Sequence, residues 1–242
     1  MNVAEYKARR AASVASAGRD VCPRCRKARP TCYCHRLRPF ASPVPFVILQ
    51  HHEEARNAIA TARMAHLSLT NSRLIVDGAF PAGHPEVEAL LADPARRNVM
   101  LYPAPDAQPL DARLAEDAAT GRETTYWVLD AKWSQVPKML RLSPCVRAMP
   151  TVAFEPDRES LFRVRRQPHR ACLSTIEAIY VVIERYLRVR GLESTAHEAL
   201  LDVFRHLVEQ QLGYVGPGQT SRHRAAMAWR AERRRERAAS EG

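Results

Sequence analysis

Four cysteines near the start of the chain have the spacing of a metal site. Cys22, Cys25, Cys32 and Cys34 follow the pattern C-x2-C-x6-C-x-C in a stretch rich in basic side chains. Thiolates bind zinc tightly, and clustered thiols in a reducing compartment hold a tetrahedral metal more often than they form disulfides. We expect a structural zinc ion on these sulfurs, with His35 as a spare ligand. Reduced cysteines in a flexible segment and an iron–sulfur cluster are the alternatives.

A second group of chemically capable residues is Asp130-Ala131-Lys132-Trp133. It lies where the apolar run at 124–131, a predicted strand, gives way to a helix. A carboxylate at the carboxyl end of a strand can accept a proton or hold a cationic ligand. Aspartate is also a common helix N-cap, and the residues alone leave both roles open.

The elements that must position these residues alternate between strands and helices. Short apolar runs bounded by turn residues predict buried strands at 46–50, 72–78, 98–104 and 124–131. Stretches with helical spacing predict helices at 57–69, 85–93 and 134–143. This alternation indicates an α/β fold with a parallel sheet covered by helices on both faces. Ligands bind at the carboxyl ends of such strands, so the informative loops follow residues 50, 103 and 129.

The last third of the chain is expected to be mainly helical. Ser174 and Glu177 have capping-box spacing, and the apolar face that follows predicts a helix ending at Gly191. A second helix is expected at about 195–212. Two further strands are expected at 151–154 and 161–165.

Basic residues are concentrated at the ends of this 242-residue chain, whose net charge is +11. Residues 1–40 hold ten basic and two acidic side chains, and residues 221–242 hold seven arginines and three acids. A near-neutral body with basic ends fits a catalytic domain whose arms bind nucleic acid, although solvated tails have the same composition. We divide the chain into a basic extension, a cysteine module, a main domain and an arginine-rich tail, at 1–20, 21–40, 41–214 and 215–242.

Several classes of protein do not fit the sequence. It has no apolar stretch of membrane-spanning length and no secretory signal pattern at its start, so we expect a soluble cytoplasmic protein. It also lacks a GxGxxG or P-loop motif, which removes the usual signals for dinucleotide and nucleoside-triphosphate chemistry. Nothing in the sequence indicates the oligomeric state.

Four segments in order resemble the successive motifs of the DTW-domain family, the tRNA-uridine aminocarboxypropyltransferases. They are ILQHHEEARNAIATARMAHLSLTNSRLIVDG, LYPAPDA, VLDAKWSQVPKML and LSTIEAI. The cysteine cluster is also similar to the one that precedes this domain in bacterial members. The motif that names the family is Asp-x-Thr-Trp; this chain keeps Asp130 and Trp133 but has Lys132 in place of Thr.

The resemblance implies a knotted α/β domain like that of the SPOUT methyltransferases, with S-adenosylmethionine bound at the strand ends. It implies transfer of the 3-amino-3-carboxypropyl group from S-adenosylmethionine to N3 of a uridine in tRNA, with release of methylthioadenosine. Protonated N3 is a poor nucleophile, so a carboxylate acting as general base would help, and Asp130 is the candidate. The alternatives are an RNA methyltransferase, which Lys132 keeps open, and a zinc-containing RNA-binding protein without catalysis.

The matching loops supply the expected ligands. The adenosine is expected to contact Tyr102, Pro103, Ala104, Asp106 and Leu129, and the methionine end to contact Ser174, Thr175 and Glu177. The tRNA is expected to contact His51, Glu53, Arg56, Asn57 and Lys132. Trp133 either stacks on a base or fills the core, and Glu177 also fits a purely structural role in the capping box.

Overall fold

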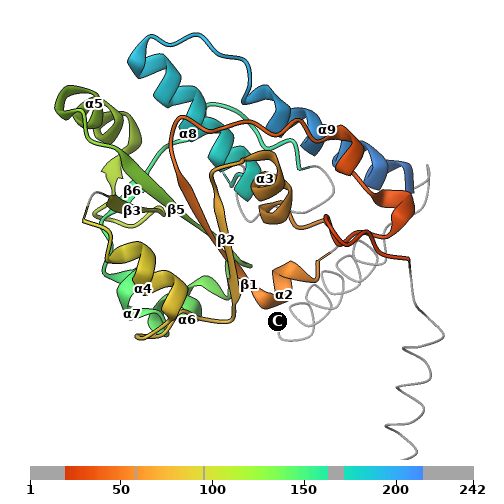
Figure 1. Cartoon of the computed structure of the whole chain (residues 1–242), viewed down its shortest axis with the longest axis horizontal. Coiled ribbons are helices and arrows are strands. Elements are labelled where there is room, and N and C mark those ends of the chain that lie inside the picture. The colour runs from red at the N-terminus through yellow and green to blue at the C-terminus, as the bar shows by residue number, and fades with distance from the viewer. Residues whose placement is uncertain (1–19, 58, 95, 163–171, 215–242) are drawn as a thin grey trace, which may run out of the picture.

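The computed structural model describes residues 20–57, 59–94, 96–162 and 172–214 (Figure 1). The basic extension, except for its last residue, and the whole arginine-rich tail therefore lie outside the described residues. Leu161 and Phe162 are not in a strand, and the rest of the strand expected at 161–165 also lies outside them. No helix in the described part of the chain is both long and apolar enough to span a membrane.

A six-stranded parallel sheet forms the centre of the molecule, with the strand order β2-β1-β5-β3-β6-β4. The strands are β1 (Phe46–His51), β2 (Arg73–Asp77), β3 (Arg97–Leu101), β4 (Gln108–Pro109), β5 (Thr124–Asp130) and β6 (Thr151–Ala153). Strand β5 lies between β1 and β3, so the carboxyl ends of these three strands adjoin. The predicted parallel α/β fold is confirmed, while the knotted path stays a prediction.

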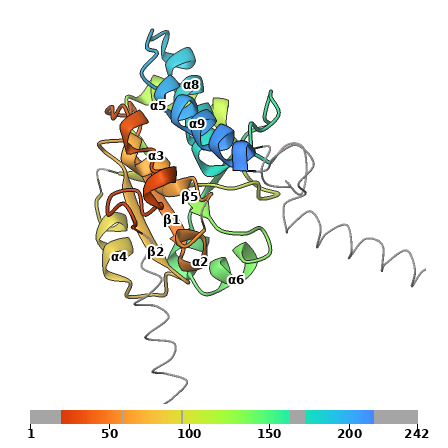
Figure 2. The same cartoon turned by 90° about the vertical axis from the view of Figure 1, so that its right-hand side faces the viewer.

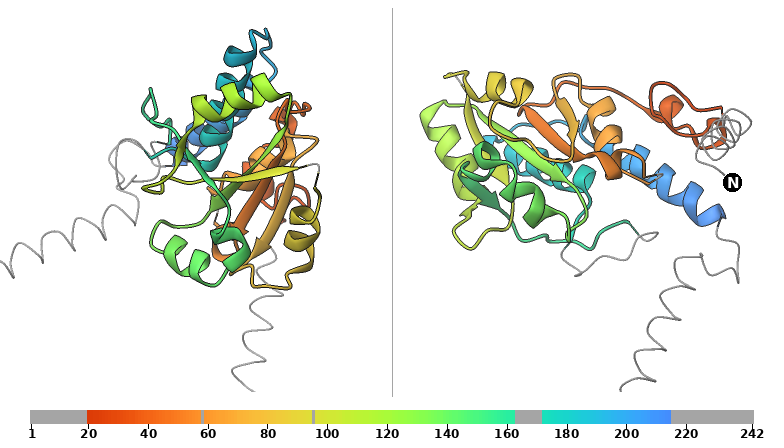
Figure 3. Two further views of the ribbon diagram at one scale, coloured as in Figure 1. Left: turned by 90° about the vertical axis from the view of Figure 1, so that its left-hand side faces the viewer. Right: turned by 90° about the horizontal axis from the view of Figure 1, so that it is seen from below.

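Helices cover both faces of the sheet (Figures 1 and 3). One face carries α3 (Ala62–Ser68), α5 (Leu110–Thr120), α8 (Thr175–Arg190) and α9 (Glu198–Tyr214). The other carries α4 (Pro85–Leu91), α6 (Val136–Arg141) and α7 (Pro144–Arg147). The remaining described helices are the short α2 (His52–Ala55) and the 3₁₀ turns η1 (Arg29–Thr31) and η2 (Cys34–Arg36).

The apolar run of β1 is uninterrupted because the strand is buried on both of its faces. Successive side chains of a strand point to opposite faces of a sheet. Phe46 and Ile48 accordingly join the core under α3, α8 and α9, whereas Val47 and Leu49 join the core under α4, α6 and α7. Both sets are fully buried, so a polar residue at any of the four positions would lie in a core.

The expected helices at 57–69 and 134–143 differ from the structure for local reasons. The first begins only at Ala62, because the side chain of Asn57 accepts a hydrogen bond from the N–H of Ile59 and forms a turn instead. The second is the shorter α6, which ends at Arg141, and the separate helix α7 begins beyond it at Pro144, because proline lacks an N–H and fits the first turn of a helix.

Helix α5 and the two-residue strand β4 were not predicted. Among the eleven residues of α5, only Leu110, Leu114 and Asp117 are buried, so its apolar face is too narrow to stand out in the sequence. Helix α8, by contrast, begins with the predicted capping box of Ser174 and Glu177 and ends before Gly191.

The cysteine module packs against the first face of the sheet. Cys22, Cys25 and Tyr33 belong to the same buried core as α3 and α9, and η2 contacts α9 (Figure 1). Tyr33 is fully buried, so the module contributes a large side chain to this core.

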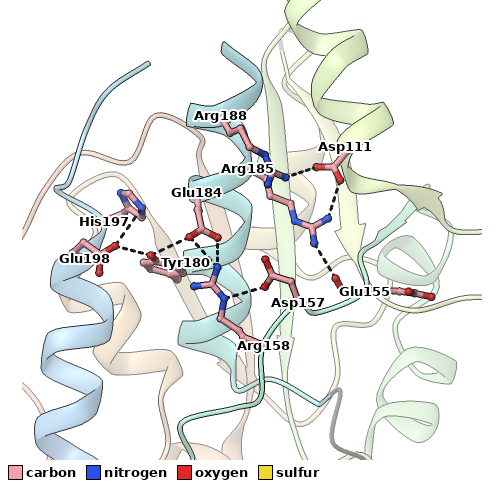
Figure 4. Close-up of polar contacts among 10 residues, drawn as sticks. All are labelled: Asp111, Glu155, Asp157, Arg158, Tyr180, Glu184, Arg185, Arg188, His197 and Glu198. Carbon is pink, nitrogen blue, oxygen red and sulfur yellow. Dashed lines mark hydrogen bonds and ion pairs between the residues drawn. The ribbon is translucent and has the colours of Figure 1, made fainter. Parts of the chain in front are cut away.

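A polar network ties α8 to its neighbours (Figure 4). Arg185 donates to the carboxylate of Asp111 on α5 at 3.0 Å and to the carbonyl of Glu155 at 2.9 Å. Arg158 donates to Glu184 at 2.8 Å. The other residues drawn are Asp157, Tyr180, Arg188, His197 and Glu198. The network thereby holds the segment after β6 against α8.

Replacing Trp127 with Ala tests how much the core under α4, α6 and α7 contributes to stability. Its side chain is fully buried, and its indole N–H donates to Asn98 Oδ1 at 2.8 Å. Removing a buried aromatic side chain costs about 3–5 kcal/mol, so we expect denaturant titration to show this loss in the free energy of unfolding. The matched control is Trp133→Ala, because Trp133 is 46% exposed. Equal destabilisation by the two replacements would contradict this placement.

Candidate active site

Asp130 ends β5 in the middle of the carboxyl edge of the sheet. Its side chain is buried and accepts hydrogen bonds from Gln50 Nε2 at 2.8 Å and from Thr175 Oγ1 at 2.6 Å. The parallel register pairs Gln50 with Asp130, and Thr175 is the first residue of α8. The next helix, α6, has Gln135 as its N-cap, so Asp130 does not cap it. Three elements therefore fix the orientation of this carboxylate.

Two cavities open on either side of the loop after β5. The polar cavity, of about 290 Å³, is lined by residues that include Glu54, Thr61, Asp130, Ser134 and Ser174. The apolar cavity, of about 340 Å³, is lined by residues that include Leu101, Tyr102, Pro103, Val152 and Phe154. Leu129, Trp133, Leu173 and Thr175 line both. Trp133 is therefore a shared, exposed wall and does not fill the core.

Glu177 holds the start of α8 to the preceding loop. Its Oε2 accepts hydrogen bonds from the N–H of Ser174 at 2.8 Å and from the hydroxyl of Ser160 at 2.8 Å. Its Oε1 accepts the N–H of Leu161 at 2.6 Å. Glu177 lines neither the polar nor the apolar cavity. These contacts support the structural role that capping-box spacing predicts, extended to residues 160 and 161.

Lys132 pairs with α2 beside these cavities. Lys132 Nζ lies 3.2 Å from Glu53 Oε2, which also accepts a hydrogen bond from Gln135 Nε2 at 2.6 Å. These hydrogen bonds lower the pKa of Glu53. His51 accepts a bond from the N–H of Glu53 and stacks on His52, and burial lowers the pKa of His51. Figure 2 shows α2 and α6 at this end of the sheet.

The other residues predicted to bind the adenosine or the tRNA lie in two different loops. Tyr102, Pro103 and Leu129 line the apolar cavity, whereas Ala104 and Asp106 lie further along the same loop and line neither cavity. Arg56 and Asn57 line a third cavity, described next. The structure thus brings Asp130, Trp133, Ser174 and Thr175 together, and gathers the predicted tRNA contacts at and beside α2.

A third cavity, of about 420 Å³, lies between the cysteine module and β1; we call it the basic cavity. Its lining includes Arg26, Lys27, Gln50, Arg56 and Arg63. Lys27 Nζ donates to the carbonyl of Asn57 at 3.1 Å, and burial lowers the pKa of Lys27 to about 8. Gln50, Glu54 and Arg63 are cavity-lining residues that were not predicted from the sequence. The one available signal was the polar Gln50 at the end of the apolar run FVILQ.

The four predicted metal ligands meet at one point. The Sγ atoms of Cys22 and Cys34 are 3.8 Å apart, those of Cys25 and Cys32 are 3.7 Å apart, and all four lie within 4.8 Å of one another. Sulfurs around a tetrahedral zinc, with bonds of about 2.3 Å, are separated by about 3.8 Å. Hydrogen bonds from the backbone at Cys25 and Arg24 lower the pKa of Cys22 to about 6, whereas burial raises the pKa of Cys25 and of Cys34. The cluster is compatible with a metal site.

Comparison with known proteins points to one family. The model of the DTW domain matches residues 19–212. The tRNA-uridine aminocarboxypropyltransferase 2 of Drosophila melanogaster is 30% identical over 165 residues, which are 66% of this chain and 63% of that protein. The protein of the same name from Mus musculus is 25% identical over 168 residues, which are 68% of this chain and 56% of that protein. The chain thus spans less than two thirds of the length of either relative.

No solved structure matches the chain. The match to the DTW domain nevertheless extends over most of the chain, from before the cysteine cluster to α9. It contains the four segments on which the resemblance was based, and Asp130 and its hydrogen-bond partners lie inside it. The resemblance seen in the sequence is therefore confirmed, and the chain belongs to the DTW-domain family.

Proposed function

We propose that this protein transfers the 3-amino-3-carboxypropyl group of S-adenosylmethionine to N3 of a uridine in tRNA, with methylthioadenosine as the second product. The observation that carries the proposal is Asp130, a buried carboxylate with two fixed hydrogen-bond donors at the centre of the carboxyl edge. The names of the two similar proteins, which are tRNA-uridine aminocarboxypropyltransferases, support the same reaction. tRNA also suits the net charge of +11, and tRNA modification would place the protein in the cytoplasm.

The two cavities that flank the loop after β5 fit the two ends of S-adenosylmethionine. The apolar cavity offers Tyr102, Pro103 and Leu129 to the adenosine. The polar cavity offers Ser174 and Thr175, at the start of the sixteen-residue helix α8, to the charged methionine end. The partial positive charge of a helix N-terminus favours a carboxylate there. When bound, S-adenosylmethionine supplies an electrophilic γ-carbon attached to its sulfonium sulfur.

Asp130 would accept the proton of uridine N3. Its two oxygens each accept one of the bonds from Gln50 and Thr175, and a carboxylate oxygen has capacity for another donor. Loss of the proton makes N3 a nucleophile, because its lone pair becomes available to form the N3–C bond as the C–S bond breaks. The indole of Trp133, exposed between the cavities, offers a stacking face to a base.

The contacts of Lys132 do not favour methyl transfer. Lys132 lines neither the polar nor the apolar cavity, and its ammonium group pairs with Glu53. The replacement of the family's Thr by Lys132 therefore adds no side chain to the walls of the two cavities. Cofactor pose, and hence the choice between the γ-carbon and the methyl group, depends on those walls.

The test of this function is mass spectrometry of nucleosides from unmodified tRNA incubated with the purified protein and S-adenosylmethionine. We expect a uridine that carries the aminocarboxypropyl group, together with methylthioadenosine. A methylated nucleoside with S-adenosylhomocysteine would overturn the proposal in favour of a methyltransferase. Tight tRNA binding without any product would overturn it in favour of a non-catalytic RNA-binding protein.

Asp130→Asn should abolish turnover and spare tRNA affinity. Asparagine cannot accept the N3 proton, and general-base catalysis contributes about 10²–10⁴-fold, so we expect kcat to fall at least about 100-fold. The dissociation constant for tRNA should change by less than about twofold, because Asp130 carries no positive charge for the RNA backbone. Asp202→Asn, an exposed position on α9, is the matched control and should retain wild-type kcat. Wild-type rates in Asp130→Asn would remove this residue from the mechanism.

We propose that the cysteine cluster holds one structural zinc ion. When free zinc exceeds its dissociation constant about 1,000-fold, bound metal stabilises the folded state by about 4 kcal/mol. Chelation of zinc should therefore lower the melting temperature, and elemental analysis should find one zinc per chain in the untreated protein.

Cys25→Ser should lose this zinc, and Cys145→Ser, outside the cluster, should keep it. Elemental analysis of the two variants checks the assignment directly. Iron in place of zinc, or zinc retained by Cys25→Ser at wild-type stoichiometry, would contradict it.

A further inference from the structure

Four basic side chains line the basic cavity. Arg26 and Lys27 come from the cysteine module, Arg56 follows α2, and Arg63 belongs to α3. Among the described residues, no Asp or Glu lines this cavity. Within the described part of the chain, none of the three arginines forms an ion pair or a hydrogen bond with an acidic side chain. Gathering like charges in a partly desolvated space costs free energy unless an anion compensates them.

Gln50 supplies a second, independent sign of a ligand. It lines the same cavity, its side chain is 0% exposed, and its Nε2 donates to Asp130. Its Oε1 is buried and has no hydrogen-bond partner among the described residues. A carboxylate partner fixes the orientation of the amide, because only the NH₂ group can donate to Asp130. The cavity therefore presents a buried acceptor that needs a donor.

Arg26 lies in a strained turn beside this cavity. Its φ of 57° lies in the left-handed region, and it is the one residue other than glycine with a positive φ in the described part of the chain. The tight turn around the cysteines demands this conformation, since the N–H of Arg26 donates to the carbonyl of Cys22 at 2.8 Å. Glycine would adopt it without strain.

We propose that the basic cavity binds a phosphate-bearing nucleotide of the tRNA, next to the uridine that is modified. Arg26, Arg56 and Arg63 would hold the phosphate, and a ribose hydroxyl would donate to Gln50 Oε1. This inference rests on the proposed function, because it takes tRNA as the substrate. Gln50 touches the nucleotide with one end of its amide and Asp130 with the other, so an occupied cavity would also hold the carboxylate in place.

The experiment compares three variants of the full-length, zinc-loaded protein in binding to an unmodified tRNA transcript. Arg63→Gln removes a charge from the cavity, and Arg26→Gly removes a charge while relieving the strained turn. Arg122→Gln is the matched control, because Arg122 is exposed and precedes the amino end of β5 at the opposite edge of the sheet. Dissociation constants are measured over a series of salt concentrations, and KM is measured separately for tRNA and S-adenosylmethionine.

We expect each cavity variant to raise the dissociation constant for tRNA about tenfold and to lower the slope of its logarithm against log salt by about one. KM for S-adenosylmethionine should be unchanged, Arg122→Gln should bind as the wild type does, and Arg26→Gly should retain its zinc and its melting temperature.

Equal effects of Arg63→Gln and Arg122→Gln on tRNA binding would overturn the inference. A rise in KM for S-adenosylmethionine, with tRNA binding unchanged, would also overturn it and assign the cavity to the carboxylate of that molecule. The experiments distinguish an error in the nucleotide site from an error in the proposed function. If the wild type makes no product but the cavity variants still lose tRNA affinity, the function is wrong and the nucleotide site stands.

Discussion

The hydrogen bonds that Asp130 accepts from Gln50 and Thr175 are the constraint on which the candidate site depends. A carboxylate buried at the edge of a sheet must receive donors, since an unsatisfied buried charge is costly. Those donors come from β1 and from the first residue of α8, which are 80 and 45 residues away in the chain. The β1–β5 register and the start of α8 must both be correct before the carboxylate is satisfied. Assembly of the fold and assembly of the site are thus the same event.

The capping box at the start of α8 positions Thr175, the second of the two donors to Asp130. Ser174 and Glu177 fix where the helix begins, and therefore where Thr175 lies relative to Asp130. Glu177 also holds residues 160 and 161, so the same side chain sets the helix end and the adjoining wall. A one-residue shift of α8 would turn the Thr175 side chain by about 100° around the helix axis and remove it from the carboxylate.

Local patterns made much of this architecture predictable. Neighbouring residues are enough to predict the buried strands, the capping box and the cysteine cluster. They also predict that Asp130 lies at the end of a strand. The basic cavity could not be predicted in the same way, because Arg26, Gln50 and Arg63 come from three separate segments. Nothing in the neighbourhood of Arg63 distinguishes it from an ordinary helix-surface arginine. These residues reach one cavity only because the cysteine module packs on the core under α3, α8 and α9.

Lys132 illustrates how a departure from a family motif is accommodated. A lysine in place of a small hydroxyl residue places a positive charge on a longer, flexible side chain beside the site. Here the ammonium group reaches Glu53 on α2, and Gln135 donates to the same carboxylate oxygen, so the added charge is balanced locally. Both side chains of the ion pair are about half exposed, so solvent screens their attraction and the pair adds little to stability. The pair therefore balances the added charge without fixing the geometry of the loop after β5. Asp130 stays in the wall of the polar cavity, and Trp133 stays in the walls of both cavities.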